Sequence, residues 1–361
     1  MTKREAEILK WIEENPLISQ NELADKANIT RSSVAVHISN LIKKGKIIGK
    51  GYILKPQKNI IVIGGANVDI AGIPKGILKE EDSNPGNIKY SLGGVGRNIA
   101  ENLARLSQNV ELITVLGNDP NGENIKNNCR DLNINLHNSL ILPHANTSTY
   151  LFILDENKDM KVAISAMDIF NNLTVDFIKN KMDFINKASI CILDTNPPQE
   201  TIEYIANNCS IPLFVDCVST NKAIKIKSIL NKIHTLKPNK IEAEFLSGIK
   251  ITDDDSLEKV SEYFINKGIK QIFISLGKDG VYYSNGSLKG KLNPYTTKVI
   301  NSTGAGDAFM AGIAYGFINE ENIIDSCKFG LKASAITLTS ENTINENINL
   351  DILTNFKEDT K

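Results

Sequence analysis

A glycine-containing loop that leads into an apolar helix carries the clearest chemistry of the sequence: Asn301-Ser302-Thr303-Gly304-Ala305-Gly306-Asp307-Ala308-Phe309. Its small residues allow the backbone amides of Gly304, Ala305 and Gly306 to converge on an anion at the helix N-terminus. Asp307 follows directly, where a carboxylate would repel a phosphate unless it collects a proton. We therefore interpret Asp307 as a general base that deprotonates a hydroxyl nucleophile. The simpler alternative is an aspartate that only caps the helix.

Two further turns are suited to a nucleotide and its metal ion. In Lys237-Pro238-Asn239-Lys240-Ile241-Glu242, Asn239 and Glu242 stand three positions apart at an expected strand-to-helix junction. Both side chains could face one Mg²⁺ ion, which takes a few oxygen ligands and keeps several waters. The turn Ser275-Leu276-Gly277-Lys278-Asp279-Gly280 follows a strand, and its glycines allow close approach by a nucleotide. The nucleotide contacts that we predict are Asn239, Ser275, Gly277 and Gly280.

In this order and spacing, the Gly-Ala-Gly-Asp loop, the Asn-x-x-Glu pair and the Ser-Leu-Gly-x-x-Gly turn resemble the ribokinase/PfkB family of carbohydrate kinases. The resemblance covers about residues 59–345. It implies transfer of a phosphoryl group from ATP to an alcohol, with Mg²⁺ positioned on the phosphates through Glu242 and Asn239. The sequence has no GxxxxGK[ST] segment, so a P-loop kinase is not expected.

The resemblance also identifies a substrate end. Gly65-Ala66-Asn67-Val68-Asp69 stands where the family places an aspartate that grips sugar hydroxyls, and two carboxylate oxygens can accept from the two hydroxyls of a ribose-like diol. Gly93-Gly94-Val95-Gly96-Arg97-Asn98 matches the family's glycine-rich sugar loop. A Rossmann dinucleotide loop is the alternative, but neither glycine cluster fits GxGxxG. The implied substrate ligands are Asn67, Asp69, Gly93, Gly94 and Asn98.

Three stretches look like bacterial pseudouridine kinases within this family: residues 83–104, 233–239 and 301–308. We therefore expect phosphorylation of the 5′-hydroxyl of pseudouridine. One rival is another sugar or nucleoside kinase, acting on ribose, adenosine or inosine. Another is a transcription regulator that only senses a nucleoside, although sensing alone needs no base at Asp307. Many family members have Asp at the position of Asn301, where it helps to hold a monovalent cation, so a potassium requirement is left open.

The elements that must position these residues alternate between short apolar strands and helices. Strands are predicted at residues 60–63, 110–115, 190–193, 213–215, 234–236 and 272–275. With a helix at about residues 96–106 and others between the strands, this predicts an α/β fold with a doubly wound, mostly parallel sheet, here of the ribokinase-like type. Residues 149–164 predict a β-hairpin, which in such an enzyme often belongs to a small β lid that shields the site from water.

Residues 1–56 predict a separate domain ahead of a kinase domain at 59–361. The first helical pattern ends before Pro16, the second begins near Gln20, and the third is capped by Thr30 or Ser32. The third helix carries the apolar residues Val34, Val36, Ile38, Leu41 and Ile42. Two short strands around a glycine-containing turn follow at 46–54. Three helices and a basic hairpin resemble a winged helix-turn-helix domain.

This resemblance implies that the third helix enters the major groove of DNA. The residues offered to the bases would be Arg31, Ser32, Ser33 and His37. The lysines that could meet phosphates are Lys43, Lys44, Lys46 and Lys50. The distribution of charge also favours DNA binding. Residues 1–58 are basic, with 11 Lys/Arg and 6 Asp/Glu, whereas the chain as a whole has a net charge of −1. The alternative is a winged helix kept only for dimerisation.

The composition excludes several other classes of protein. Hydrophobic residues make up 41% and charged residues 23%, as is typical of a globular protein. No apolar run approaches the length of a membrane span, and the first ten residues lack the apolar core of a secretory signal. The five cysteines are scattered and form no CxxC pair, which indicates reduced thiols in a cytoplasmic protein. The two resemblances imply ATP, a nucleoside or sugar, and DNA at residues 1–56 as partners. We also expect a second copy in a homodimer, and no membrane.

Overall fold

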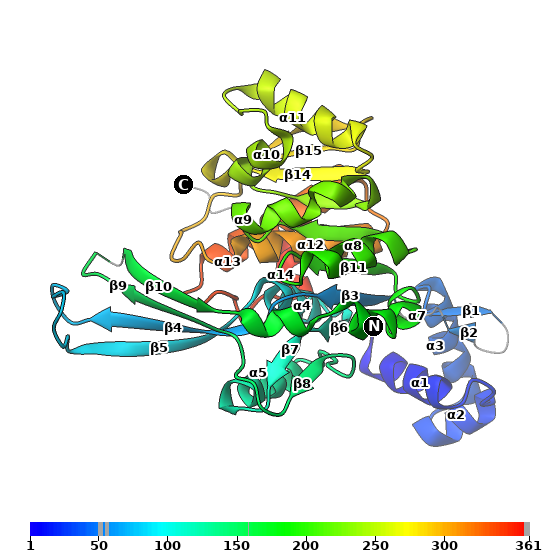
Figure 1. The fold of residues 1–361 in the computed structure, drawn as a ribbon. Coiled ribbons are helices and arrows are strands. Elements are labelled where there is room, and N and C mark those ends of the chain that lie inside the picture. The colour runs from blue at the N-terminus through cyan, green and yellow to red at the C-terminus, as the bar shows by residue number, and fades with distance from the viewer. Residues whose placement is uncertain (50–52, 55–57, 158, 357–361) are drawn as a thin grey trace. The chain divides into compact units, whose positions relative to one another are not determined.

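The computed structural model describes residues 1–49, 53–54, 58–157 and 159–356 of the chain. The chain divides into two compact units, Met1–Gln57 and Lys58–Lys361 (Figure 1). Each unit has its own hydrophobic core. None of the described helices is long and apolar enough to cross a bilayer. All five cysteines are free thiols, and four of them are buried.

The N-terminal unit has three helices and a two-stranded antiparallel sheet, as the sequence predicts. Its elements are α1 (Lys3–Glu14), α2 (Gln20–Ala27), α3 (Arg31–Lys43), β1 (Ile47–Gly49) and β2 (Ile53–Leu54). Capping boxes at Thr2 and Ser19 begin α1 and α2, and the Thr30 hydroxyl begins α3 by accepting from Ser33 N. The predicted turn between the strands, with Lys50, lies outside the described residues.

The apolar residues of α3 divide between the core of this unit and its surface. Val34, Ile38 and Leu41 are buried, whereas Val36 is 59% and Ile42 is 47% exposed. A helix turns by about 100° per residue, which brings positions 34, 38 and 41 to one face and carries 36 and 42 away from it.

The larger unit is built on an eight-stranded sheet in the order β16-β15-β14-β13-β12-β11-β3-β6. The first six strands in the sequence pair in parallel: β3 (Asn59–Ile63), β6 (Asn109–Ile113), β11 (Ile190–Asp194), β12 (Leu213–Asp216), β13 (Thr235–Lys237) and β14 (Gln271–Ser275). Antiparallel β15 (Val281–Ser284) and β16 (Lys289–Leu292) complete one edge. The doubly wound, mostly parallel sheet predicted from the sequence is confirmed.

Both faces of this sheet are covered by helices, because its strands alternate apolar side chains between two cores. On one face lie α6 (Val175–Lys179), α7 (Met182–Ile185), α8 (Gln199–Asn208), α10 (Lys240–Ser247) and α11 (Asp254–Asn266). On the other lie α4 (Val95–Arg105), α12 (Ala305–Ile318) and α13 (Ile323–Leu338). The remaining helices are α5 (Pro120–Asp131), α9 (Thr220–Ala223) and α14 (Leu350–Asn355), with short 3-10 turns at η1 (Asp168–Asn172), η2 (Ile224–Lys232) and η3 (Gly277–Asp279).

The single strand predicted at residues 110–115 is wrong. The chain breaks at Thr114, whose N–H donates to Ser139 Oγ at 3.0 Å. Beyond the break, β7 (Val115–Gly117) pairs with β8 (Leu140–Leu142) in a separate two-stranded sheet.

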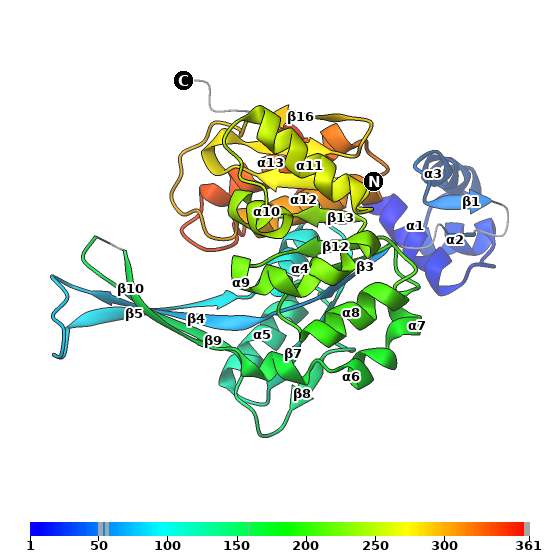
Figure 2. The ribbon, with the colours of Figure 1, turned by 45° about the horizontal axis from the view of Figure 1, so that its top comes forward.

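A four-stranded sheet projects from the body of this unit as a long ribbon (Figure 2). It contains the predicted hairpin, β9 (Thr149–Leu154) and β10 (Met160–Ala166), together with β4 (Asn67–Pro74) and β5 (Gly86–Gly93), in the order β10-β9-β4-β5. Directly paired residues share a face of the sheet. Asp69 on β4 therefore lies on the same face as Tyr150 on β9 and Ser91 on β5. We call this sheet the lid.

Candidate active site

The predicted anion loop forms the N-terminus of α12, with Gly304 as the N-cap residue. The φ of Gly304 is +83°, and a Cβ atom there would lie 2.0 Å from Thr343 O, so only glycine fits. Gly306 O accepts a hydrogen bond from Lys237 Nζ at 3.1 Å. The loop amides of Gly304, Ala305 and Gly306 therefore stand at a helix N-terminus next to a lysine, which is suited to a phosphate.

Asp307 lies in the first turn of α12 but not at the N-cap position. Its Oδ2 accepts a hydrogen bond from Asn98 Nδ2 at 2.7 Å, so the side chain faces the N-terminal part of α4. Burial, and after it the charge of nearby Asp216, raise the pKa of Asp307 to about 7 against the opposing effects of Lys237 and Asn98. A carboxyl group that titrates near neutral pH is well matched to general base catalysis.

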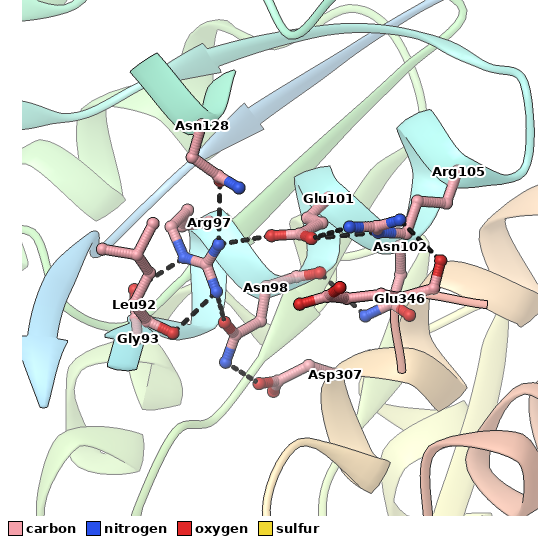
Figure 3. Close-up of polar contacts among 10 residues, drawn as sticks. All are labelled: Leu92, Gly93, Arg97, Asn98, Glu101, Asn102, Arg105, Asn128, Asp307 and Glu346. Carbon is pink, nitrogen blue, oxygen red and sulfur yellow. Dashed lines mark hydrogen bonds and ion pairs between the residues drawn. The ribbon is translucent and has the colours of Figure 1, made fainter. Parts of the chain in front are cut away.

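A buried network fixes the orientation of Asn98 (Figure 3). Arg97 NH2 donates to Asn98 Oδ1 at 2.6 Å, which turns the amide nitrogen of Asn98 toward Asp307. Arg97 also pairs with Glu101, and Glu101 is bound in turn by Arg105 at 2.8 Å. Arg97 is further held by the backbone oxygens of Leu92 (2.8 Å) and Gly93 (3.1 Å). The sequence analysis found the loop but assigned no role to Arg97.

The predicted ribose ligands gather at the start of β4. Asn67 Nδ2 donates to Asp69 Oδ1 at 2.6 Å, and a Cβ atom on Gly93 would lie 2.4 Å from Asp69 Oδ2. Gly94 has a φ of +96° and faces Gly65 O, where a Cβ atom would clash at 2.4 Å. Burial raises the pKa of Asp69 to about 6. The structure therefore brings together all five residues predicted at the substrate end, with Asn98 joining them to Asp307.

Asp194, at the end of β11, organises these loops and was missed in the sequence. Its Oδ2 accepts from Gly65 N at 2.7 Å and from Gly96 N at 3.0 Å, so one carboxylate ties both glycine loops to the sheet edge. Asn196 N and Nδ2 donate to the same carboxylate, each at 2.8 Å. Burial raises the pKa of Asp194, while these bonds favour its charged form. An aspartate directly after an apolar strand is the only signal that the sequence offers for it.

Asn239 and Glu242 form a capping box at the start of α10. Asn239 Oδ1 accepts from Glu242 N at 2.9 Å, and Glu242 Oε2 accepts from Asn239 N at 2.8 Å. Beside them, Lys237 Nζ pairs with Asp216 Oδ2 at 2.8 Å. Burial and the charge of Asp216 raise the pKa of Glu242.

These side chains fit a Mg²⁺ ion held through water. Three carboxylates (Asp216, Glu242 and Asp307) act on the ammonium group of Lys237, and Asp216 raises the pKa of the other two, which leaves negative charge for a divalent ion to offset. Among the described residues, no three His, Cys, Asp or Glu side chains are placed to coordinate a metal directly. Mg²⁺ commonly keeps several waters, and the capping box leaves one oxygen of Glu242 to bind them.

The predicted nucleotide turn follows β14. Ser275 N donates to Pro238 O at 3.0 Å, which places Ser275 beside Asn239. Gly280 has a φ of +86°, and a Cβ atom there would lie 2.0 Å from Leu292 O, so the fold requires glycine. Gly277 also has a positive φ of +62°, but a Cβ atom there would meet no atom within 4 Å. The space over Gly277 is therefore open to a ligand.

The fold and this arrangement define the class of protein. The model of the pfkB family carbohydrate kinases matches residues 57–349, and the chain belongs to this family. It is therefore an ATP-dependent phosphotransferase of the ribokinase-like type. The model of a winged helix-turn-helix DNA-binding family matches residues 1–48.

Individual proteins and a solved structure with similar sequences are also kinases. The chain is 39% identical over 299 residues to the pseudouridine kinase of Escherichia coli K12, which covers 82% of this chain and 96% of that protein. It is 38% identical over 353 residues to the uncharacterized sugar kinase YeiI of the same organism, covering 97% and 98%. A carbohydrate kinase from Agrobacterium tumefaciens has a TM-score of 0.74 at 27% identity, covering 82% of this chain and 96% of that one.

Proposed function

We propose that this protein transfers the γ-phosphoryl group of ATP to the 5′-hydroxyl of pseudouridine. The observation that carries this proposal is the 2.7 Å hydrogen bond between Asn98 and Asp307, which joins the ribose-binding loops to the base at the anion loop. The choice of nucleoside is supported by the 39% identity to a pseudouridine kinase over most of the chain.

In the proposed transfer, the residues of the site bind the ribose, remove a proton and stabilise charge. Asp69 would accept hydrogen bonds from the ribose diol. Asn67 donates to Asp69, and Asn98 links the ribose-binding loops to Asp307. The 5′-hydroxyl loses its proton to Asp307 as its oxygen forms a bond to Pγ, while the bond from Pγ to the β-phosphate oxygen breaks and ADP leaves. The amides of Gly304, Ala305 and Gly306 and the nearby Lys237 would stabilise the charge on the transferred group.

Mg²⁺ would supply further neutralisation of the phosphates when bound, held through water by Glu242 and Asn239. The nucleotide would lie along Ser275, Gly277 and Gly280. Asn301 carries no charge, and its side chain bonds to Thr303 N at 3.0 Å and to Glu341 O at 3.2 Å. This arrangement argues against a strong requirement for potassium, which replacing K⁺ by an organic cation in the assay would test.

The rival substrates are ribose, adenosine and inosine, and the experiment that separates them is a turnover screen. The full chain is incubated with ATP, Mg²⁺ and each candidate, and formation of ADP is followed. The proposal expects pseudouridine to give the highest kcat/KM. A higher value for ribose or a purine nucleoside would assign the same site to a different substrate. No turnover with any of them would favour a sensor.

We further propose that the N-terminal unit binds DNA through α3. Arg31 and Ser32 are exposed at its N-terminus, and exposed Val36 could meet a thymine methyl group. His37 is half-buried with a buried Nδ1 atom, so it is less suited to this role than we predicted. Lys44 is ion-paired to Glu5 at 2.6 Å, which leaves Lys43 and Lys46 as better phosphate contacts. A cytoplasmic location suits both this role and the five free cysteines.

The expected homodimer has a candidate surface on the lid face opposite Asp69. Tyr90, Ile70, Leu151 and Ile164 form one paired row across the four strands, and Ile88, Gly72, Ile153 and Val162 form the next. The four outer side chains, Ile88, Tyr90, Val162 and Ile164, are 55–66% exposed. Large exposed apolar patches commonly mark interfaces, so we propose that two copies pair through this face. Light scattering should show a dimer, and Ile164→Asp should produce monomers.

A further inference from the structure

Lys222 in α9 is a half-buried lysine beside the ribose loops with no part in the transfer described above. Its Nζ donates to Asn196 Oδ1 at 2.6 Å and lies 3.8 Å from Met167 Sδ. Within the described part of the chain it forms no ion pair. An ammonium group has three donors, and a thioether is a weak acceptor. The ammonium group of Lys222 is therefore incompletely satisfied.

The carboxylate that acts electrostatically on Lys222, Asp194, already has hydrogen-bond donors. It accepts from the backbone of Gly65 and Gly96 and from both nitrogens of Asn196. Its charge favours the protonated form of Lys222, while burial lowers the pKa of this lysine. A partly desolvated cation that faces a saturated carboxylate still gains from an oxygen acceptor on a ligand.

The neighbouring Lys225 has a structural role, which contrasts with that of Lys222. Its Nζ donates to the backbone oxygens of Thr195 at 3.0 Å and Pro197 at 2.8 Å. It therefore ties the loop after β11 to the chain after β12. Lys222, one turn earlier, makes no such backbone bond in the described structure and instead reaches toward the lid connection at Met167.

The position of Lys222 relative to the ribose loops suggests what it would meet. Asn196 Nδ2 lies 2.6 Å, and Phe170 Cζ 3.4 Å, from where a Cβ atom on Gly65 would stand, two residues before Asn67. A ribose with its 5′-hydroxyl at Asp307 and its diol at Asp69 directs its C1′ substituent away from Asp307. The base would then lie near the foot of the lid, where Met167 and Phe170 follow β10.

We infer that Lys222, held in place by Asn196, donates a hydrogen bond to a ring carbonyl oxygen of the nucleobase. This inference rests on the proposed function and deepens it, because it makes Lys222 a specificity residue for nucleosides with a pyrimidine-2,4-dione ring. Adenine has no carbonyl oxygen to accept this bond, and free ribose has no ring at all. Asn196 acts through Lys222 as a positioning residue.

The test is a cycle of two enzymes and two substrates with the full-length protein. The substrates are pseudouridine and the phenyl C-riboside, which keeps the C–C glycosidic bond and a flat six-membered ring but has no carbonyl oxygen. The enzymes are the wild type and Lys222→Met, which keeps the length of the side chain without its charge. Lys222→Arg restores a cationic donor, and Lys227→Met, at an exposed lysine of η2, is the matched control.

For the wild type, kcat/KM should be about 10- to 100-fold lower with the phenyl C-riboside than with pseudouridine. This is the usual contribution of a hydrogen bond to a charged group. Relative to the wild type, Lys222→Met should show a similar loss of kcat/KM with pseudouridine but little loss with the phenyl C-riboside. Lys222→Arg should recover part of the activity with pseudouridine. Equal losses of Lys222→Met on both substrates would overturn the inference. So would a raised KM for ATP with an unchanged KM for pseudouridine, because the lysine would then contact phosphates. If the wild type does not phosphorylate pseudouridine at all, the proposed function itself fails, which is a distinct result.

Discussion

Asn98 Nδ2 lies 2.7 Å from Asp307 Oδ2, although the two residues are 209 positions apart in the chain. Arg97 holds the other end of the Asn98 amide, so the donor can point only toward the carboxylate (Figure 3). This contact joins the loop that would hold the ribose to the residue that would take its proton.

Asp307→Asn should lower kcat by roughly 100- to 10,000-fold, which is the usual contribution of a positioned general base. Binding of nucleoside and ATP should change little, because an amide fills the same space. Steady-state kinetics and calorimetry separate the two effects. Asp255→Asn, at an exposed position on α11, is the control and should behave as the wild type. Near-normal turnover by a folded Asp307→Asn variant would remove this residue from its role.

The pH dependence of kcat/KM should reflect the ionisation of Asp307. Asp307 must be ionised to act as a base, so kcat/KM should rise with pH through a pKa of about 7. The bond from Asn98 favours the ionised form, so Asn98→Leu should move the inflection to higher pH, whatever it does to the rate. A profile whose inflection stays in place in Asn98→Leu would show that the two side chains are not coupled.

The proposed binding of the ribose diol by Asp69 predicts a preference for ribosides over 2′-deoxynucleosides. Asp69→Ala should abolish useful binding of ribosides, because it leaves the diol without its acceptors. Since burial raises the pKa of Asp69 to about 6, riboside affinity should also rise as the pH increases through 6 and the carboxyl group ionises. Calorimetric titrations at several pH values measure both effects. If 2′-deoxynucleosides are phosphorylated as well as ribosides, the diol argument is wrong.

The parts of the site that lie in short continuous motifs could be predicted from the sequence, and the parts that depend on distant contacts could not. Gly304 to Asp307 carry their own backbone geometry, so residue types alone indicated an anion loop. Asp194 gains its role from the amides of Gly65 and Gly96, about 100 or more positions away, which no local pattern reveals.

The same reasoning explains the missed strands of the lid. Residues 67–74 and 86–93 form β4 and β5, but they carry polar and glycine residues on a sheet that has no buried side along much of its length. Without a core face, neither segment shows the apolar alternation that identified the strands of the main sheet. Thr114 divided another predicted strand because Ser139, 25 positions later, accepts its N–H.

DNA binding by the N-terminal unit should depend steeply on salt, because lysine contacts to phosphate release counterions. Replacing exposed Lys46 by Gln should reduce the slope of log affinity against log salt by about one, while Lys44→Gln should change it less, since Lys44 is paired with Glu5. Fluorescence anisotropy with duplex DNA upstream of the gene measures both. Absence of salt-dependent binding, together with loss of the oligomer on deleting residues 1–56, would make this unit an assembly module. Kinase activity should survive that deletion.

The central claim is tested most directly by a competition between pseudouridine and uridine in one reaction with limiting ATP, with the two 5′-phosphates separated and quantified. The two nucleosides share the ribose and both carbonyl oxygens and differ in how the base is attached. The account predicts that pseudouridine 5′-phosphate forms in clear excess over uridine 5′-phosphate, and that Asp307→Asn forms neither at a comparable rate. Equal or preferential phosphorylation of uridine would contradict the assignment of pseudouridine as the substrate.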